Sequence, residues 1–360
     1  MVDARVTGPV RIVGAGLLGT SIGLVLRRHG VDVTLLDTSP TAVALATQYG
    51  AGRPGTDADS PALIVVAVPP DVVADVVTRE LAAFPEAIVT DVASVKGAIL
   101  GDLVSRGNDL SRYVGSHPMA GRERGGAVAA RADIFTGRSW VVCTRSDANN
   151  AAINLVSDLV IDCGANLVEM STDDHDAAVA LVSHVPQIVS SAVASSLIGA
   201  SDSAVGLAGG GLRDVTRIAA SEPNLWLQIL SANSTAVTAV LAGVHERLGA
   251  VLDALRGDAP AVTLAELLTA GNAGVARIPG KHGRSAHFAH ILVVIDDRPG
   301  QLAQLLADIG DLGINMEDLR LEHSPGSAIG FAEVSVLASA EATLVRELEV
   351  RGWRIAGEGQ

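Results

Sequence analysis

Short β-branched and aliphatic runs alternate with segments of helical periodicity from Val10 to about Met170. The runs are VRIVGAG, VDVTLLD, ALIVVAVPP, AIVTDVAS, SWVVCT and NLVEM. Strands that alternate with helices are typical of a mostly parallel, doubly wound sheet. We therefore predict an α/β domain over residues 1–170.

The pattern becomes helical after this domain. Ser171, followed by Asp174, resembles a capping box that opens a long helix. Helical periodicity then continues to about Arg256. The sequence predicts an all-helical domain over residues 171–256.

The C-terminal part changes pattern again. Residues 257–286 are rich in Gly, Pro and basic residues around one short helical piece, a composition that marks a linker. Residues 287–360 then read strand, helix, strand, strand, helix, strand. This order is the split βαβ arrangement of small ferredoxin-like α+β modules.

Composition narrows the class of partner. The formal net charge of -14 disfavours nucleic acid and anionic membranes, since neither polyanion gains from an acidic surface. The two cysteines, Cys143 and Cys163, lie in apolar runs, and the sequence has neither a disulfide framework nor the spacing of a metal site. We predict a globular protein without a metal.

Two segments bear on location. The N-terminus lacks the basic start and long apolar core of a secretion signal, so the expected compartment is the cytoplasm. The longest uncharged stretch, residues 177–201, contains His184, Pro186, Gln187 and several serines. We interpret it as a buried helix and not as a membrane span.

A glycine pattern typical of dinucleotide binding follows the first strand. Gly14, Gly16 and Gly19 have the G-x-G-x-x-G spacing at the start of a helix, and Leu17 and Leu18 complete the loop GAGLLG. The first glycine permits a tight turn, the second lets the backbone approach a pyrophosphate, and the third allows close packing of helix on strand. The α/β domain is therefore predicted to be Rossmann-like.

Asp37 indicates which dinucleotide binds. It ends the second strand, where a carboxylate can accept hydrogen bonds from both ribose hydroxyls and would repel a 2′-phosphate. The pattern favours NAD over NADP. Val68 and Pro69 end the next strand and are expected near the nicotinamide. A plain glycine turn with a capping Asp is the structural alternative.

His117, in the segment GSHPMAG, is the candidate base. Hydride transfer from a carbon that bears a hydroxyl needs a group that manages the hydroxyl proton, and a histidine titrates near neutrality. Ser94 in DVASVKG offers a hydroxyl partner, and Lys96 a cation in the same crevice. The structural alternatives are a loop histidine bonded to a carbonyl and a serine that caps a helix.

Two polar pairs fall in the helical region. His184 and Gln187 share one helix face in SHVPQ, and Asp214 and Arg217 have the same spacing in GLRDVTRIAAS. The guanidinium fork suits a substrate carboxylate. An ion pair between Arg217 and Asp214 is the structural alternative, and both readings are compatible.

Together these segments resemble the TyrA family of prephenate and arogenate dehydrogenases over about residues 10–250. They are GAGLLG, DVASVKG, GSHPMAGRERGG, SHVPQ, and GGGLRDVTRIAAS with Trp226. The resemblance implies NAD-dependent oxidative decarboxylation of prephenate to 4-hydroxyphenylpyruvate in tyrosine biosynthesis. Hydride would leave ring C4, and the ring carboxylate would leave as CO2.

The resemblance also implies residue roles. His117 would take the C4 hydroxyl proton, Ser94 would help to orient it, and Arg217 would bind a substrate carboxylate. Further residues would gate or line the pocket: Glu123, Asp214, Trp226 and His184. Gln187 departs from the second histidine of many relatives, and its amide suits either the keto group of prephenate or the ammonium of arogenate.

The tail, residues 295–322, resembles an ACT domain, a small module that binds amino acids. Pro299 and Gly300 would form the turn into its first helix, whose N-terminus can hold an effector carboxylate. Asn315 would join the effector site across a dimer contact. The resemblance implies feedback inhibition by tyrosine or another aromatic amino acid; a packing or dimerisation module without a ligand is the alternative.

The leading hypothesis is a homodimeric, cytoplasmic, NAD-dependent prephenate dehydrogenase. An arogenate dehydrogenase and a hydroxyacid dehydrogenase of the phosphoglycerate type are the alternatives within enzymes. A non-catalytic sensor of NAD and amino acids belongs to a different class. The combination of Ser94, His117 and Arg217 argues against a sensor, because sensing needs none of their chemistry.

Overall fold

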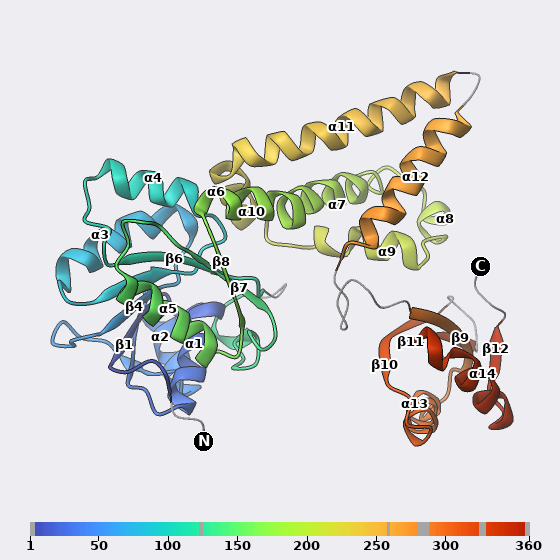
Figure 1. Cartoon of the computed structure of the whole chain (residues 1–360), viewed down its shortest axis with the longest axis horizontal. Helices are drawn as coiled ribbons and strands as arrows, with labels where there is room; N and C mark the ends of the chain where they lie inside the picture. Colours follow the sequence, from blue (N-terminus) through green and yellow to red (C-terminus); the bar gives the residue numbers. More distant parts are fainter. Residues whose placement is uncertain (1–3, 122–124, 258–259, 279–287, 324–328, 357–360) are drawn as a thin grey trace. The chain divides into compact units, whose positions relative to one another are not determined.

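The N-terminal strands form one eight-stranded sheet in the computed structural model of the chain, in the order β3-β2-β1-β4-β5-β6-β7-β8 (Figure 1). The structure describes residues 4–121, 125–257, 260–278, 288–323 and 329–356. The strands are β1 (Val10–Val13), β2 (Val33–Leu36), β3 (Arg53–Pro54), β4 (Leu63–Val66), β5 (Ile88–Asp91), β6 (Tyr113–Pro118), β7 (Ser139–Cys143) and β8 (Asn166–Met170).

The strands of this sheet are parallel except at one junction. β6 runs antiparallel to β7, and every other neighbouring pair is parallel. All four residues of β1 and of β4 are buried, as expected for strands that helices cover on both faces. The predicted mostly parallel, doubly wound sheet is confirmed. The two-residue strand β3 was not predicted.

Helices cover both faces of the sheet. The helices are α1 (Leu17–Arg28), α2 (Pro40–Gln48), α3 (Val73–Ala83), α4 (Gly97–Ser105) and α5 (Asn150–Asp162), with short turns η1 (Pro70–Val72) and η2 (Ala127–Ala129). Side chains of α1, α2 and α5 join one hydrophobic cluster, and those of α3 and α4 join another. Along β4, alternate residues enter the two clusters because successive side chains of a strand point to opposite faces.

The first long helical stretch is not one regular helix. Ser171 caps α6 (Thr172–Val179), accepting a hydrogen bond from the Asp174 amide at 3.1 Å. A π-helical turn, η3 (Ala180–His184), then precedes α7 (Val185–Ser195). Pro186 has no N–H to donate and crowds the preceding turn, and a wider turn relieves both problems. The predicted cap is confirmed, and the predicted long helix is interrupted.

The chain divides into two units. The first comprises residues 1–199 and 216–244, and the second comprises residues 200–215 and 245–360. The first contains the sheet, α6, η3, α7, η4 (Arg217–Ala219), α10 (Pro223–Ala232) and the start of α11 (Ser234–Arg256). Ala180, Val185 and Val237 form the small core of its helical part. The residues of the candidate site described below belong to this unit, except for Asp214 and the residues of the C-terminal tail.

The second unit begins with helices. They are α8 (Asp202–Val205), most of α9 (Gly210–Thr216), the end of α11, and α12 (Ala261–Val275). The 15 residues of α12 replace the short helical piece expected in the segment 257–286. Its Ala and Leu content sustains a regular helix, despite the glycines and prolines that flank it.

The C-terminal part of the second unit has the predicted element order. It consists of β9 (Phe288–Asp296), α13 (Gln301–Asp311), β10 (Met316–His323), β11 (Ile329–Leu337), η5 (Ala338–Ala340), α14 (Glu341–Val350) and β12 (Arg354–Ala356). The strands form an antiparallel sheet in the order β10-β11-β9-β12. Both helices contribute leucines to one core with this sheet. The structure thus has the split βαβ topology that the sequence predicts.

Two helical stretches are long and apolar enough, by length and composition alone, to cross a membrane. They are Thr172–Ser195, whose most apolar part is one-third buried, and Ser234–Arg256, whose most apolar part is only 6% buried. Leu181, Val182 and Ile198 are exposed in the single chain, so the stretch 177–201 is less buried than predicted. Such helices also occur in soluble proteins, and two of them are weak support for a membrane span.

Candidate active site

The glycine loop after β1 has the geometry of a phosphate-binding turn. Gly14 has φ +109°, and a side chain there would collide with the carbonyl of Ala67. A side chain at Gly19 would collide with the Gly14 carbonyl, whereas one at Gly16 would meet nothing within 4 Å. The outer glycines are therefore required by the fold, and Gly16 leaves open space at the N-terminus of α1.

Asp37 lies beside this loop. Its Oδ2 accepts a hydrogen bond from the Ala15 amide, and its Oδ1 accepts one from the Ser39 amide, both at 2.8 Å. These bonds hold the carboxylate at the carboxyl end of β2, where its remaining lone pairs can receive ribose hydroxyls. The residues present therefore fit a dinucleotide without a 2′-phosphate.

Leu17 and Leu18 contribute differently from the glycines. Their side chains are partly buried against the hydrophobic cluster under α1. Val68 and Pro69 follow β4, which pairs directly with β1. They lie where predicted, at the carboxyl edge of the sheet.

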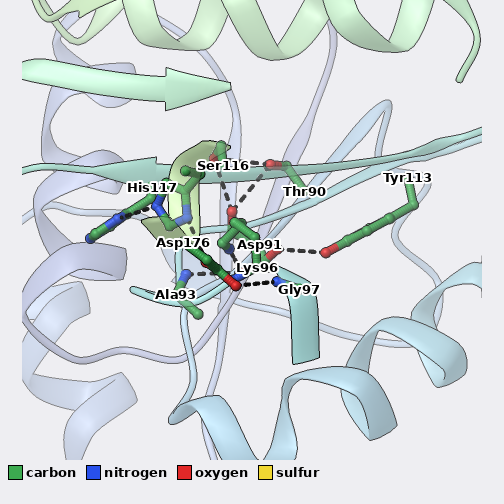
Figure 2. Close-up of polar contacts among 10 residues, drawn as sticks. Thr90, Asp91, Ala93, Lys96, Gly97, Tyr113, Ser116, His117 and Asp176 are labelled. Carbon is green, nitrogen blue, oxygen red and sulfur yellow. Dashed lines mark hydrogen bonds and ion pairs between the residues drawn. The ribbon is translucent and has the colours of Figure 1, made fainter. Parts of the chain in front are cut away.

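His117 lies near the end of β6 and is buried. Its Nδ1 is 2.9 Å from Nε2 of His175, and the two rings meet edge to face (Figure 2 shows His117). No described residue forms a hydrogen bond with its Nε2. Burial lowers the pKa of His117 well below its ordinary value, and nearby His175, Lys96 and His184 add to this shift. The imidazole is therefore neutral at neutral pH and can accept a proton.

A carboxylate stands behind the two histidines. Nδ1 of His175 is 2.8 Å from Oδ1 of Asp176. The same carboxylate accepts hydrogen bonds from the backbone amides of Lys96 at 3.0 Å and Gly97 at 2.8 Å, at the N-terminus of α4 (Figure 2). Burial works to raise the pKa of Asp176, but the bonds from His175, Gly97 and Lys96 outweigh it, and the pKa is lowered.

The predicted role of Lys96 as a cation in the crevice is wrong. Its side chain is buried and forms an ion pair with Asp91, whose other oxygen accepts a hydrogen bond from Tyr113 at 2.7 Å. The buried Asp91 carboxylate at the end of β5 pairs with the Lys96 ammonium, because an unpaired buried charge would destabilise the protein. Ser94 lies half-buried between β5 and α4, and within the described residues it forms no hydrogen bond with His117.

The predicted pocket residues of the helical part lie close to this network. His184, in η3, contacts Asn233 at 3.2 Å, and Asn233 donates a hydrogen bond to the Asp176 carbonyl at 2.8 Å. The rings of His184 and of Trp226 in α10 are nearly perpendicular, with 6.1 Å between ring centroids. Burial lowers the pKa of His184 to about 4, so it is neutral at neutral pH.

Gln187 is buried and held by the protein. Its Nε2 donates a hydrogen bond to Ser221 Oγ at 2.7 Å. The donor end of the amide is thereby used inside the protein, and the carbonyl oxygen is left as an acceptor.

The charged residues that were predicted at the site are exposed or lie outside the described residues. Arg217 is exposed in η4, and Asp214 is exposed in α9 of the second unit. Neither has a salt bridge to another described residue, so the predicted pair between them is not observed. Glu123 lies outside the described residues.

The predicted effector residues adopt the expected local structure. Gly300 has φ +92° and caps the N-terminus of α13, directly after Pro299. Asn315 is exposed before β10 and donates a hydrogen bond to Glu317 at 3.4 Å. The turn and the helix N-terminus that a carboxylate needs are present.

Three members of the network were not predicted: His175, Asp176 and Asn233. His175 and Asp176 contact His117 and α4 across 58 and 79 residues of sequence, respectively. The available signal was a His–Asp pair in the first turns of the helix that follows the sheet. No spacing rule connects such a pair to a distant base.

Comparison with known proteins places the chain in a family. Residues 22–169 match the family model of the prephenate dehydrogenase nucleotide-binding domain, and residues 171–269 match that of the prephenate dehydrogenase dimerization domain. The probable prephenate dehydrogenase NovF of Streptomyces niveus is 36% identical over 353 residues, covering 95% of this chain and 98% of the relative.

Two more distant proteins are similar over 62% and 75% of the chain. The prephenate dehydrogenase of Bacillus subtilis is 29% identical, covering 62% of this chain and 64% of the relative. The crystal structure of prephenate dehydrogenase from Aquifex aeolicus with hydroxyphenyl propionate and NAD+ is 26% identical, with a TM-score of 0.68, covering 75% of this chain and 98% of that one. With both family models matched in order and one relative aligned over nearly its whole length, this chain belongs to the prephenate dehydrogenase family of NAD-dependent oxidoreductases.

Proposed function

We propose that the protein converts prephenate and NAD to 4-hydroxyphenylpyruvate, CO2 and NADH. The observation that carries the proposal is His117, a buried neutral imidazole with one ring nitrogen bonded to the protein and the other without a described partner. It lies on the same sheet edge as the Gly14 loop, because β1, β4, β5 and β6 run parallel as neighbours. NAD, when bound, supplies the hydride acceptor.

The proton and the electrons balance with His117 as base. Hydride leaves ring C4, the C4 hydroxyl proton moves to Nε2 of His117, and the carbon–oxygen bond becomes a carbonyl. Loss of the ring carboxylate as CO2 then returns an electron pair to the ring. The resulting phenolate takes the proton back from His117, and aromatisation supplies the driving force.

Other residues of the first unit are proposed to hold the substrate. Arg217 binds a carboxylate through its guanidinium fork, and Trp226 and His184 form a wall of the pocket. Ser94 assists His117. We assign gating to Glu123 and Asp214 on the resemblance alone.

Gln187 supports arogenate as a second candidate substrate. Its amide donates to Ser221 and leaves a carbonyl oxygen as acceptor. An acceptor suits the ammonium of arogenate, whereas the keto group of prephenate needs a donor. The reaction at C4 is the same for both substrates.

We also propose that the protein is a cytoplasmic homodimer with a regulatory tail. Each chain would comprise a Rossmann-like domain (1–170), a helical domain (171–256), a linker (257–286) and the C-terminal module (287–360). Leucines and valines of α12 and of the end of α11, within the second unit, are exposed in the single chain, and we propose that a second copy covers them, in keeping with the matched dimerization model. The C-terminal sheet is proposed to be an ACT module that binds tyrosine at the turn of Pro299 and Gly300.

NADH absorbance on mixing the protein with NAD and either substrate tests the proposal. Turnover of prephenate with NAD, and weak turnover with NADP, is the expected result. Faster turnover of arogenate than of prephenate would identify the protein as an arogenate dehydrogenase. Absence of turnover with both substrates and both cofactors would overturn the enzyme proposal in favour of a sensor. Inhibition by added tyrosine is expected if the tail regulates, because tyrosine must then favour one conformation.

A further inference from the structure

We propose that His175 and Asp176 are positioning residues that fix the tautomer of His117, so that Nε2 of His117 carries the lone pair that takes the substrate proton. The inference rests on the proposed role of His117 as base. It is drawn from an unbroken chain of two short contacts: Asp176 Oδ1 to His175 Nδ1 at 2.8 Å, and His175 Nε2 to His117 Nδ1 at 2.9 Å.

The positions of the ring protons on His175 and His117 follow from the Asp176 carboxylate at the end of this hydrogen-bonded chain. An ionised carboxylate can only accept hydrogen bonds, so Nδ1 of His175 must carry a hydrogen. In a neutral ring, Nε2 of His175 is then an acceptor, and Nδ1 of His117 must donate to it. The remaining nitrogen of His117, Nε2, therefore holds the lone pair.

Asp176 is held in its ionised form by α4. Its two oxygens accept hydrogen bonds from the amides of Lys96 and Gly97, at the N-terminus of this nine-residue helix, where the helix dipole also favours a negative charge. Asp176 and His175 are both buried, so little solvent competes for these bonds. The carboxylate serves as a remote cap for α4 and as the anchor of the histidine pair.

The same chain stabilises the charge that appears on His117. A proton taken from substrate creates an imidazolium in a buried position, where burial lowers the pKa of the ring. The Asp176 carboxylate, one ring away, offsets that charge without itself taking the proton. In serine proteases a carboxylate bonded directly to the histidine base fixes the tautomer and stabilises the imidazolium, and an amide in its place yields the wrong tautomer; here His175 lies between the carboxylate and the base.

The hydrogen-bonded chain from Asp176 to His117 links the base, which belongs to the sheet, to residues of the helical part. His117 comes from β6 and the amides from α4, whereas His175 and Asp176 come from α6. Asn233, at the end of α10, donates to the Asp176 carbonyl at 2.8 Å and fixes this turn of α6. His175 of α6 alone contacts Nδ1 of His117, whereas α4 and Asn233 hold Asp176 behind it.

Asp176→Asn tests the proposal, with Asp173→Asn in the exposed first turn of α6 as the matched control. With its amide nitrogen in the Oδ1 position, asparagine donates to His175, which reverses both tautomers and places a hydrogen on Nε2 of His117. With the nitrogen in the Oδ2 position it faces the Gly97 amide, and the negative charge that stabilises the imidazolium is lost in either case. We expect kcat to fall about 10²–10⁴-fold, with the Kd for NAD and the KM for prephenate unchanged. The acidic limb of the residual pH profile should move to lower pH, because the imidazolium has lost its counter-charge. The control should retain wild-type kinetics.

The tautomer is read directly from histidine ¹H–¹⁵N spectra of the ¹⁵N-labelled, full-length wild-type protein, with His117→Asn used for assignment. A protonated Nδ1 and an unprotonated Nε2 on His117 are expected. The reverse pattern in the wild type, or an Asp176→Asn variant with unchanged kcat and pH profile, would overturn the proposal. The wild-type spectrum decides the matter even if the variant does not fold. Failure of wild-type turnover would refute the proposed function, whereas the spectrum tests the relay independently.

Discussion

At the residue scale, the three glycines of the cofactor loop serve different purposes. Gly14 adopts a left-handed backbone conformation and lies against the Ala67 carbonyl, and Gly19 lies against Gly14 itself. Gly16 has open space where a side chain would be. Substitutions at these positions should therefore distinguish effects on stability from effects on cofactor binding.

Gly14→Ala should destabilise the protein whether or not NAD is present. A left-handed conformation costs a non-glycine residue on the order of 1–3 kcal/mol, and the carbonyl contact adds to this cost. Gly16→Ala should leave Tm unchanged and weaken NAD binding, because its methyl group projects into the space proposed for the pyrophosphate. Thermal melts and NAD titrations of both variants check this. Equal loss of Tm in the two variants would contradict the distinction.

Asp37→Asn should weaken discrimination against NADP. An amide has one oxygen in place of two, so it cannot keep the Ala15 and Ser39 contacts and also accept from two ribose hydroxyls. Loss of the negative charge also removes repulsion of a 2′-phosphate. We expect the ratio of kcat/KM for NAD over NADP to fall about tenfold or more, equivalent to about 1.4 kcal/mol. An unchanged ratio would show that Asp37 does not select the cofactor.

The pH dependence should reflect the lowered pKa of His117. The base form is lost when the ring is protonated, and burial moves that protonation to more acidic pH. The acidic limb of log kcat/KM should therefore lie below the ordinary histidine value of 6.5. Stopped-flow or steady-state rates across pH 4–8 measure it, with enzyme stability checked at each pH. A limb above 6.5 would exclude a base in this environment.

Residue types at the site were more predictable than their contacts. The glycines, Asp37 and His117 carry recognisable spacing or chemistry, and the structure places them along the same sheet edge. His175 and Asp176 escaped prediction because contacts across the sheet and helical parts leave no local signal. Lys96 was misassigned because the sequence does not show that Asp91 is buried beside it.

At the element scale, the segment from α6 to α7 determines where the polar pocket residues lie. The π-helical turn η3 precedes Pro186 and contains His184, and α7 contains Gln187. Periodicity predicted helix here correctly but not the wider turn, since a proline can be accommodated in several ways. The length of α12 was underestimated because flanking glycines and prolines suggested a linker.

Ser171→Ala should destabilise the start of α6 by about 1 kcal/mol, because the Asp174 amide loses its acceptor. We expect a fall in Tm of about 2–4 °C. Since α6 also positions His175, kcat should fall more than the Kd for NAD changes. Ser39→Ala, which removes the equivalent cap of α2, is the matched control. It should lower Tm similarly and spare kcat. Loss of kcat in both variants would contradict a specific role for α6.

At the scale of the whole molecule, much apolar helix surface is exposed in the single chain. Leu248, Leu252 and Leu255 of α11 are each more than half exposed. Exposed apolar surface of this extent is typical of an interface. The hydrophobic pattern predicted helices but could not distinguish a buried core face from one that a second chain covers.

Leu252→Glu should therefore weaken self-association and leave the fold of each chain intact. Sedimentation velocity of the wild type should give about twice the chain mass of 36.7 kDa, and the variant should shift towards the monomer. An exposed charge change on α14, Glu349→Lys, serves as control and should remain dimeric. A monomeric wild type would refute the proposed homodimer.

His117→Asn tests whether His117 is the base in an NAD-dependent oxidation. The measurement is kcat with prephenate, alongside the Kd for NAD from a binding titration. We expect kcat to fall about 10²–10⁴-fold with the Kd for NAD unchanged, because the imidazole handles the substrate proton and does not bind the cofactor. Wild-type turnover in His117→Asn would contradict it.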